Sequence, residues 1–166
     1  MIEIDNIERL EGRLGEEIAV SDWIAMTQAR IDAFAEATDD RQWIHVDVSR
    51  AAGESPFGTT IAHGFLTLSL APTLLRQSIR LSGVRMAINY GMNRVRFTSP
   101  VPSGSRVRGR FTPLAVDHHG DAVDVTWSVT LERQDETKPC CVAEWIVRYY
   151  VSARDGRPAT LQPRSL

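Results

Sequence analysis

The segment of residues 65–79 constrains the fold of this chain more than any other. Its apolar positions cover most of the circumference of a helix: Phe65, Leu66, Leu68, Leu70, Ala71, Leu74, Leu75 and Ile79. A helix of this kind is wrapped by other elements on nearly every side. Polar residues interrupt the run, and it is too short to span a bilayer, so the sequence predicts a core helix. Pro72 removes one backbone donor within this helix, and we expect a kink or a break there.

The second half of the chain changes from a helical period to a period of two. After Gly83, alternating or β-branched and aromatic segments cover residues 84–92, 94–98, 105–116, 121–133 and 138–151, with turn-forming clusters between them. A strongly curved antiparallel sheet would bury the apolar helix and leave one sheet face alternating outward. The sequence therefore predicts an α+β fold, with a curved antiparallel sheet wrapped around a long buried helix.

Shorter elements precede the helix. Residues 15–20 fit a short edge strand. Thr27 is the expected N-cap of a helix that ends at Asp39-Asp40, and Asp47 is the expected N-cap of a second, shorter helix that ends at Gly53.

Length and charge narrow the class of protein. The 166 residues fit a single domain, 1–166, in which residues 1–13 form a short docking helix or a flexible arm and residues 153–166 a loose tail. A net charge of −2 offers no electrostatic footprint for nucleic acid. The arginines between positions 94 and 110 could meet a nucleotide phosphate, but solvated strand faces are the commoner explanation for such residues.

The cysteines and the N-terminus indicate the compartment. Cys140 and Cys141 are adjacent in a strand-like segment, so their side chains should point to opposite faces and cannot join distant parts of the chain. This usage suits a reducing cytoplasm. The first residues lack a basic region followed by an apolar run. We therefore expect a cytoplasmic protein without a membrane partner.

Asp40 and His45 are the first candidates for chemistry. They lie five positions apart across a turn, a spacing that permits both side chains to reach one cavity without requiring it. Such a pair could share a water molecule, with the imidazole accepting its proton and the carboxylate orienting it. An acid near a histidine on a surface turn is common, so the spacing alone is a weak signal.

The start of the apolar helix supplies a second candidate. The first N–H groups of a helix lack intrahelical partners and favour negative charge, so a carbonyl oxygen near Gly64 could gain enolate character there. Glycine also permits a close approach to the backbone. The alternative is that Gly64 only fits a tight turn. For His63, a buried or capping role is the favoured interpretation.

Taken together, these residues form a pattern that resembles a known family. The matching positions between 34 and 69 are Phe34-Ala35, Thr38, Asp40, His45, Ala51-Ala52, Phe57, Ile61-Ala62-His63-Gly64 and Ser69. They resemble the signature of the MaoC-like dehydratases, the (R)-specific enoyl-CoA hydratases of the hot-dog fold. That signature reads Gly-Asp-x-Asn-Pro-x-His and later His-Gly-x-x-x-x-Ser. Residues 96–101 with Gly104 are similar to the family's Phe-x-x-Pro-Val-x-x-Gly turn.

The resemblance implies roles for the matching residues. Asp40 and His45 would be the catalytic acid and base, Gly64 would lie near the thioester oxygen, and Ser69 would support the pair by hydrogen bonding. Read without the resemblance, Ser69 is a hydroxyl that bonds back to its own helix.

The chain also departs from the family's motif. It has Asp39 for glycine, Gln42 for asparagine and Trp43 for proline, which makes it similar to the nodulation protein N-like branch. Trp43 could pack over the catalytic pair or, more simply, anchor the turn. Gln42, Trp43 and His63 remain candidates for substrate contacts.

The resemblance further implies a reaction and its partners. The expected activity is reversible addition of water to trans-2-enoyl thioesters, giving (3R)-3-hydroxyacyl thioesters. The substrate would be a thioester of coenzyme A or acyl carrier protein, with no metal and no other cofactor. Two alternatives stay open: a hot-dog acyl-CoA thioesterase and a non-catalytic acyl-binding subunit. A homodimer that covers the sheet edges is also expected.

Overall fold

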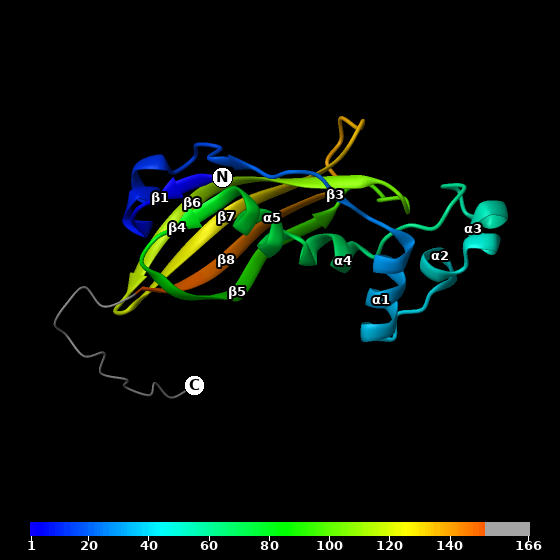
Figure 1. Ribbon diagram of the computed structural model, residues 1–166, viewed down its shortest axis with the longest axis horizontal. Coiled ribbons are helices and arrows are strands. Elements are labelled where there is room, and N and C mark those ends of the chain that lie inside the picture. Colours follow the sequence, from blue (N-terminus) through cyan, green and yellow to red (C-terminus); the bar gives the residue numbers. More distant parts are fainter. Residues whose placement is uncertain (152–166) are drawn as a thin grey trace.

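A six-stranded antiparallel sheet forms the framework of the protein, which the computed structural model describes over residues 1–151 (Figure 1). The expected tail at 153–166 lies outside these residues. The order along the sheet is β2, β6, β7, β8, β5, and β3 also pairs with β6. The strands are β2 (Ala19–Val20), β3 (Ile24–Ala25), β5 (Val84–Phe97), β6 (Arg106–His119), β7 (Ala122–Arg133) and β8 (Cys141–Val151). The sheet is curved and is not closed into a barrel, so β5 is an edge strand among residues 1–151.

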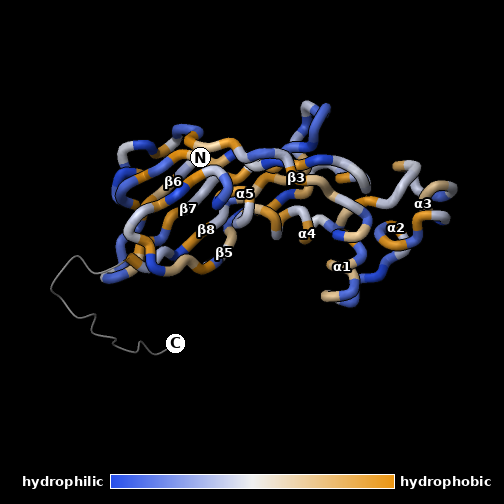
Figure 2. Tube along the Cα trace, in the orientation of Figure 1, coloured by the Kyte–Doolittle hydropathy of each residue, from blue (hydrophilic) through white to orange (hydrophobic). Residues whose placement is uncertain are grey.

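Strands β7 and β8 alternate between buried and less buried residues over most of their length, as their sequences predict (Figure 2), whereas β5 has no buried residue. In β7, Trp127 and Leu131 are buried, and in β8 the buried residues include Trp145 and Val147. The register places Trp127 opposite Trp145 and Leu131 opposite Cys141. Large apolar side chains on neighbouring strands therefore share one face of the sheet and form its core.

The apolar helix is divided into two pieces. Helix α4 covers Gly64–Ser69 and α5 covers Ala71–Ser78, with Pro72 in the first turn of α5, so the break expected at the proline is confirmed. A proline is tolerated in a first turn because its missing N–H would have no partner there. Ala71, Leu74 and Leu75 of α5 are buried, but Arg76 and Gln77 on the same helix are exposed. The expectation that the helix is covered on nearly every side is therefore wrong for the single chain.

The N-terminal residues are docked to the body of the protein. Strand β1 (Ile2–Ile4) pairs in parallel with β4 (Ile79–Leu81). The 3-10 helix η1 (Ile7–Arg13) buries Ile7 and Leu10. Of the two interpretations of residues 1–13, the docking helix is the one observed.

Several strand boundaries differ from the sequence prediction: β2 covers only Ala19–Val20 of the strand expected at 15–20, and β8 begins at Cys141 and not at residue 138. Strand β5 is continuous where two strands were expected, because irregular register between Met92 and Arg94 absorbs the interruption as a bulge. Strand β6 continues through His119, and the reversal falls at Gly120, whose φ of 66° suits glycine.

Three short helices form a lobe beyond one end of the sheet (Figure 1): α1 (Gln28–Thr38), α2 (Trp43–Val46) and α3 (Val48–Glu54). Both predicted N-caps are confirmed, since Thr27 accepts from the Arg30 N–H and Asp47 from the Arg50 N–H. The loop between α1 and α2 and the start of α4 meet where this lobe joins the sheet.

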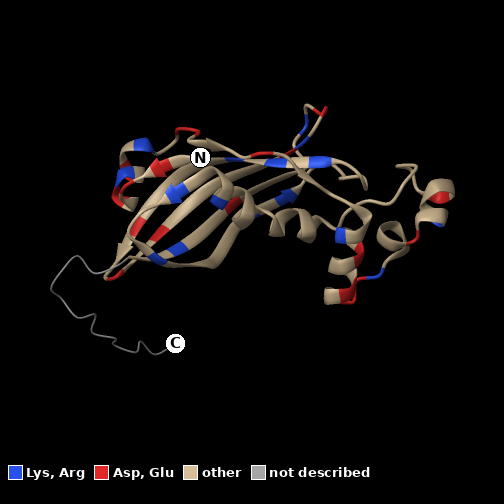
Figure 3. Ribbon diagram, viewed as in Figure 1, with Lys and Arg blue, Asp and Glu red and all other residues tan. Residues whose placement is uncertain are grey.

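Charged residues of both signs are interspersed over the view in Figure 3, without a face of one sign. Three arginines of the 94–110 region pair with acids: Arg94 with Glu144, and both Arg108 and Arg110 with Glu132. This pairing favours the solvated strand face over a phosphate site. Among residues 1–151, no helix is long and apolar enough to cross a membrane.

Candidate active site

His45 is held rigidly at its backbone and its ring. Its N–H donates to the Gln42 carbonyl at 2.9 Å, and its own carbonyl accepts from the side-chain amide of Gln28 at 2.7 Å. The ring Nδ1 lies 2.7 Å from the Ile61 carbonyl oxygen. A carbonyl only accepts, so Nδ1 carries the hydrogen and the neutral ring keeps a lone pair on Nε2. The imidazole is therefore ready to take a proton at Nε2.

The surroundings of His45 keep it neutral near pH 7. Burial lowers the pKa of its imidazole below the ordinary value of 6.5, and the neighbouring His63 acts in the same direction. The hydrogen bond to Ile61 and the charge of Asp40 oppose the lowering without cancelling it. A neutral imidazole with a free lone pair is the form that a general base needs.

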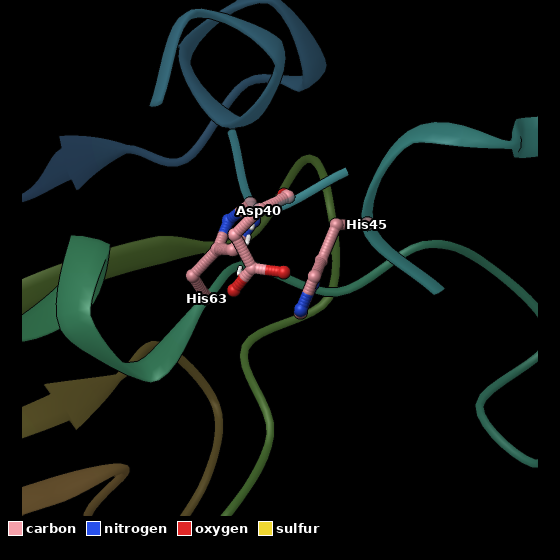
Figure 4. Close-up of side chains that lie close together, drawn as sticks. All are labelled: Asp40, His45 and His63. Carbon is pink, nitrogen blue, oxygen red and sulfur yellow. Dashed lines mark hydrogen bonds and ion pairs between the residues drawn. The ribbon is translucent and has the colours of Figure 1, made fainter. Parts of the chain in front are cut away.

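Asp40 lies in the loop between α1 and α2 and has an exposed side chain. One side-chain ligand atom each from Asp40, His45 and His63 lies within 4.8 Å of the other two. In Figure 4 the Asp40 side chain lies beside His63, with one carboxylate oxygen on the side of His45. The structure thus brings together the acid and the base that the sequence singled out.

Asp39 plays a different part from its neighbour. It is the C-cap of α1 with φ 58°, a left-handed conformation, and its side chain is 89% exposed. Arg41 lies 3.5 Å from its carboxylate. The Asp39 carboxylate is therefore solvated. The family's glycine at this position suits the same left-handed conformation, which explains why this site accepts glycine or aspartate.

His63 packs directly against the pair. Its ring stacks on His45 with centroids 3.7 Å apart, and Phe34 lies at 5.0 Å. Its Nε2 lies 2.8 Å from the Asp40 carbonyl oxygen and therefore carries the hydrogen. The side chain is 3% exposed, and its Nδ1 is buried without a hydrogen-bond partner among the described residues.

These three side chains have donor atoms suited to a metal, but their orientation does not. The two imidazole planes are inclined by only 27° and the ring centroids lie 3.7 Å apart, so the in-plane lone pairs lie in two stacked, nearly parallel planes and do not converge on one ion. One nitrogen of each ring is also committed to a backbone carbonyl. Tetrahedral coordination requires convergent ligands. We assign no metal to this cluster.

A cavity of about 320 Å³ opens beside His45. The loop before α4, the end of β5 and the following segment form its walls, and α4 contributes two residues. Its lining residues are His45, Ile61, Ala62, Gly64, Thr67, Phe97, Thr98, Ser99, Pro100, Val101 and Cys140. Two of these residues, His45 and Cys140, have ionisable side chains. Burial raises the pKa of the Cys140 thiol to about 11, so only His45 can act as a base near neutral pH. The cavity is an uncharged space with a single base on its wall.

Gly64 meets a side chain that the sequence did not predict. The Phe97 ring lies over its Cα, so that a Cβ on Gly64 would come within 2.8 Å of the ring atoms Cγ and Cδ2. Phe97 packs edge-on against Phe65 at 5.6 Å, and the two residues are 44% and 67% exposed, respectively. Glycine is therefore required here for packing as well as for access to the backbone.

The remaining candidates lie further from the cavity. The Ser69 hydroxyl donates to the Phe65 carbonyl at 2.7 Å within its own helix and is exposed. The Arg50 guanidinium covers Trp43 at 4.3 Å, and Gln42 is the N-cap residue of α2. None of these three, nor His63, lines the cavity. The hydroxyl of α4 that does line it belongs to Thr67, which donates to the His63 carbonyl.

Sequence reasoning missed several supporting residues. Gln28 joins His45 to the buried Thr60, whose hydroxyl donates to the Gln28 side-chain carbonyl. Ile61 and Phe97 contact the site from loops and strands far along the chain. The family motif contains Ile61 and Phe97 but does not show that they contact the site. The contacts of Gln28, Thr60 and Ile61 join residues 16 or more positions apart.

Comparison with known proteins shows the family to which the chain belongs. The family model of the MaoC-like domain matches residues 9–134. The chain is 51% identical over 146 residues to 3-hydroxyacyl-thioester dehydratase Z of Mycobacterium tuberculosis, covering 87% of this chain and 96% of that protein. It is 49% identical over 136 residues to nodulation protein N of Rhizobium leguminosarum, covering 81% and 84% respectively.

Solved structures of related proteins have the same fold. The R-hydratase PhaJ1 from Pseudomonas aeruginosa superposes with a TM-score of 0.66 at 22% identity, covering 92% of each chain. At this identity the likeness concerns the fold, which is the hot-dog fold expected from the motifs. With a family match over most of its length and a relative at 51% identity, the chain belongs to the MaoC-like dehydratase family and is an enzyme of the hydro-lyase class.

Proposed function

We propose that the protein catalyses reversible addition of water to trans-2-enoyl thioesters, giving (3R)-3-hydroxyacyl thioesters. The observation that carries the proposal is a neutral His45 with a free Nε2, close to the Asp40 carboxylate and on the wall of an uncharged cavity. The 51% identity to a protein named as a 3-hydroxyacyl-thioester dehydratase supports the substrate class.

His45 and Asp40 have different roles in hydration. His45 Nε2 takes one proton from a water molecule as the water oxygen bonds to C3 of the enoyl group. The electron pair of the double bond moves toward C2 and the thioester oxygen, which gains enolate character. Asp40 orients the water and takes part in moving a proton to C2, so that the elements of one water molecule are added across the double bond.

The thioester oxygen needs a partner while it carries negative charge. We assign this part to the backbone N–H groups at the start of α4 around Gly64, which have no carbonyl partners within the helix. Gly64 lines the same cavity as His45. Thr67 and Phe97 supply the neighbouring wall. Ser69, Gln42 and Trp43 are assigned only an indirect effect, since their side chains do not line this cavity.

The reaction needs no further cofactor, because the thioester itself makes C3 electrophilic. Coenzyme A or acyl carrier protein is the carrier of the substrate. The buried free thiols of Cys140 and Cys141 suit a reducing compartment such as the cytoplasm.

We further infer that the protein works as a homodimer. Strand β5 is a sheet edge of 14 residues with exposed apolar side chains along it, including Met86, Ile88, Tyr90 and Met92. A long apolar edge of this kind is normally covered. A second copy of the chain, related by two-fold symmetry, would cover it with the same surface.

Hydration of crotonyl-CoA tests the reaction. Loss of enoyl absorbance with formation of the (3R) product is expected for the intact protein, while Asp40→Asn and His45→Gln should each lose most of the rate and keep the fold. Release of free thiol without loss of the enoyl group would instead identify a thioesterase. Binding of acyl-CoA without turnover, unaffected by Asp40→Asn, would identify a non-catalytic acyl-binding subunit. Full hydration activity in either variant would contradict the assignment of the pair.

A further inference from the structure

His63 makes contacts that the proposed reaction does not itself require. We propose that His63 is a positioning residue, which holds Asp40 and His45 together and ties them to the start of α4. The inference rests on the proposed hydration for its kinetic consequences, but its structural part can be measured without substrate.

Asp40 depends on His63 for its place. Its side chain is 58% exposed and lies in the loop between α1 and α2. Among the described residues, the only hydrogen bond to Asp40 is the one that His63 Nε2 donates to its carbonyl oxygen, at 2.8 Å. The carboxylate itself lies 4.0 Å from the same nitrogen. Without this donor, no hydrogen bond in residues 1–151 would tie Asp40 to the element that carries His63.

His45 has His63 on the face of its ring. The centroid distance of 3.7 Å is a close stacking contact, and Phe34 of α1 packs on His63 in turn. A hydrogen bond to Ile61 holds His45 in the plane of its ring, and the stack limits movement out of that plane. These two restraints together aim the Nε2 lone pair, as general-base catalysis requires.

The backbone of His63 connects this pair to the other half of the site. His63 is the N-cap residue of α4, and its carbonyl accepts from both the N–H and the hydroxyl of Thr67. Gly64, the residue proposed to face the thioester oxygen, follows directly. The water-activating groups and the oxygen-binding groups are therefore held at a fixed separation by one residue.

A direct substrate contact fits His63 less well than this positioning role. The side chain is 3% exposed and does not line the cavity. One ring nitrogen is used by Asp40, and one ring face is covered by His45. A group enclosed in this way acts through its neighbours.

Two substitutions separate the hydrogen bond from the stack. His63→Phe keeps an aromatic ring against His45 but removes the donor to Asp40. His63→Gln removes the ring but keeps an amide donor at about the reach of Nε2. His118→Gln is the matched control, because His118 is an exposed histidine on β6 that contacts Glu11 and does not line the cavity.

Steady-state hydration of crotonyl-CoA gives the first readout. We expect His63→Phe to lower kcat by about 10- to 100-fold, with KM changed by less than about threefold, since a displacement near 1 Å can cost about 100-fold in rate. His63→Gln should recover part of that loss, and His118→Gln should match the unmodified protein. An unchanged kcat in His63→Phe, or a loss confined to KM, would overturn the proposal.

The second readout is the backbone order parameter of Asp40 from 15N relaxation of the protein without substrate. We expect a rigid value of about 0.85 in the unmodified protein, His63→Gln and His118→Gln, and a value below about 0.6 in His63→Phe. An unchanged value in His63→Phe would overturn the positioning role. If the unmodified protein did not hydrate crotonyl-CoA, the proposed function would fail, while a loss of Asp40 order in His63→Phe would still support the positioning role.

Discussion

The contact between Gly64 and Phe97 allows a sharp test of the site. In Gly64→Ala, the new Cβ would lie 2.8 Å from two Phe97 ring atoms and 3.0 Å from a third. Carbon atoms that are not bonded normally approach to about 3.5–4.0 Å, so the ring must move by roughly 1 Å. Phe97 is 44% exposed and can move outward, but it then gives up part of its edge contact with Phe65.

The magnitude follows from these terms. Overpacking costs about 1–3 kcal/mol, and the lost aromatic contact about 0.5–1.5 kcal/mol at most. Replacing glycine by alanine in a helix returns up to about 1 kcal/mol. We therefore expect Gly64→Ala to lower the free energy of unfolding by roughly 0.5–3.5 kcal/mol. Loss of access to the N–H groups at the start of α4 should lower kcat by about 100-fold or more.

A double-mutant cycle separates the two effects. Phe97→Ala removes the obstacle, so the stability cost of Gly64→Ala should nearly disappear in the Gly64→Ala/Phe97→Ala background, as measured by urea unfolding. The loss in kcat should persist, because the added methyl group still covers the backbone. Equal stability costs in both backgrounds would refute the packing argument. Full activity in Gly64→Ala would refute the assignment of this backbone to the thioester oxygen.

Four other outcomes are expected. The apparent pKa of the acid limb of kcat/KM for hydration should lie below 6.5, because burial lowers the pKa of His45. For the same reason, the contribution of His45 to the free energy of unfolding should be complete above about pH 6.5 and should be lost as the pH falls through the lowered folded-state pKa. Urea titrations across pH can measure this loss. Ser69→Ala should keep hydration within about twofold, since the hydroxyl bonds within its own exposed helix turn; a large loss would restore the role implied by the family motif. Asp39→Gly should change the free energy of unfolding by between roughly 0 and +1 kcal/mol, because glycine suits φ 58° but loses more entropy on folding. Leu74→Ala, at a fully buried position of α5, should cost about 2–5 kcal/mol in the same urea assay.

Local sequence determined much of the scaffold. A period of two predicted the long strands, because side chains alternate across a sheet whatever it packs against. Thr27 and Asp47 predicted helix starts, because a cap bonds to N–H groups two or three residues away. Pro72 predicted the break between α4 and α5 for the equally local reason that it cannot donate a hydrogen bond. The sequence did not predict the bulges in β5. Whether an interruption of the alternating pattern, such as the one at Asn93, ends a strand or forms a bulge depends on the partner strand.

The local sequence predicted only part of the candidate site. Asp40 and His45 are close in the chain, and the family motif singled them out. The tertiary structure alone decided which ring nitrogen of His45 carries the hydrogen and how the ring is oriented. Its hydrogen bond to Ile61 joins residues 16 positions apart, and its stack on His63 joins residues a similar distance apart in the chain. It likewise decided that Thr67, and not Ser69, faces the cavity, and that Phe97 covers Gly64. Sequence patterns report contacts within a helix turn or along a strand, whereas the aim of a lone pair is set by groups that only the packed loops bring together.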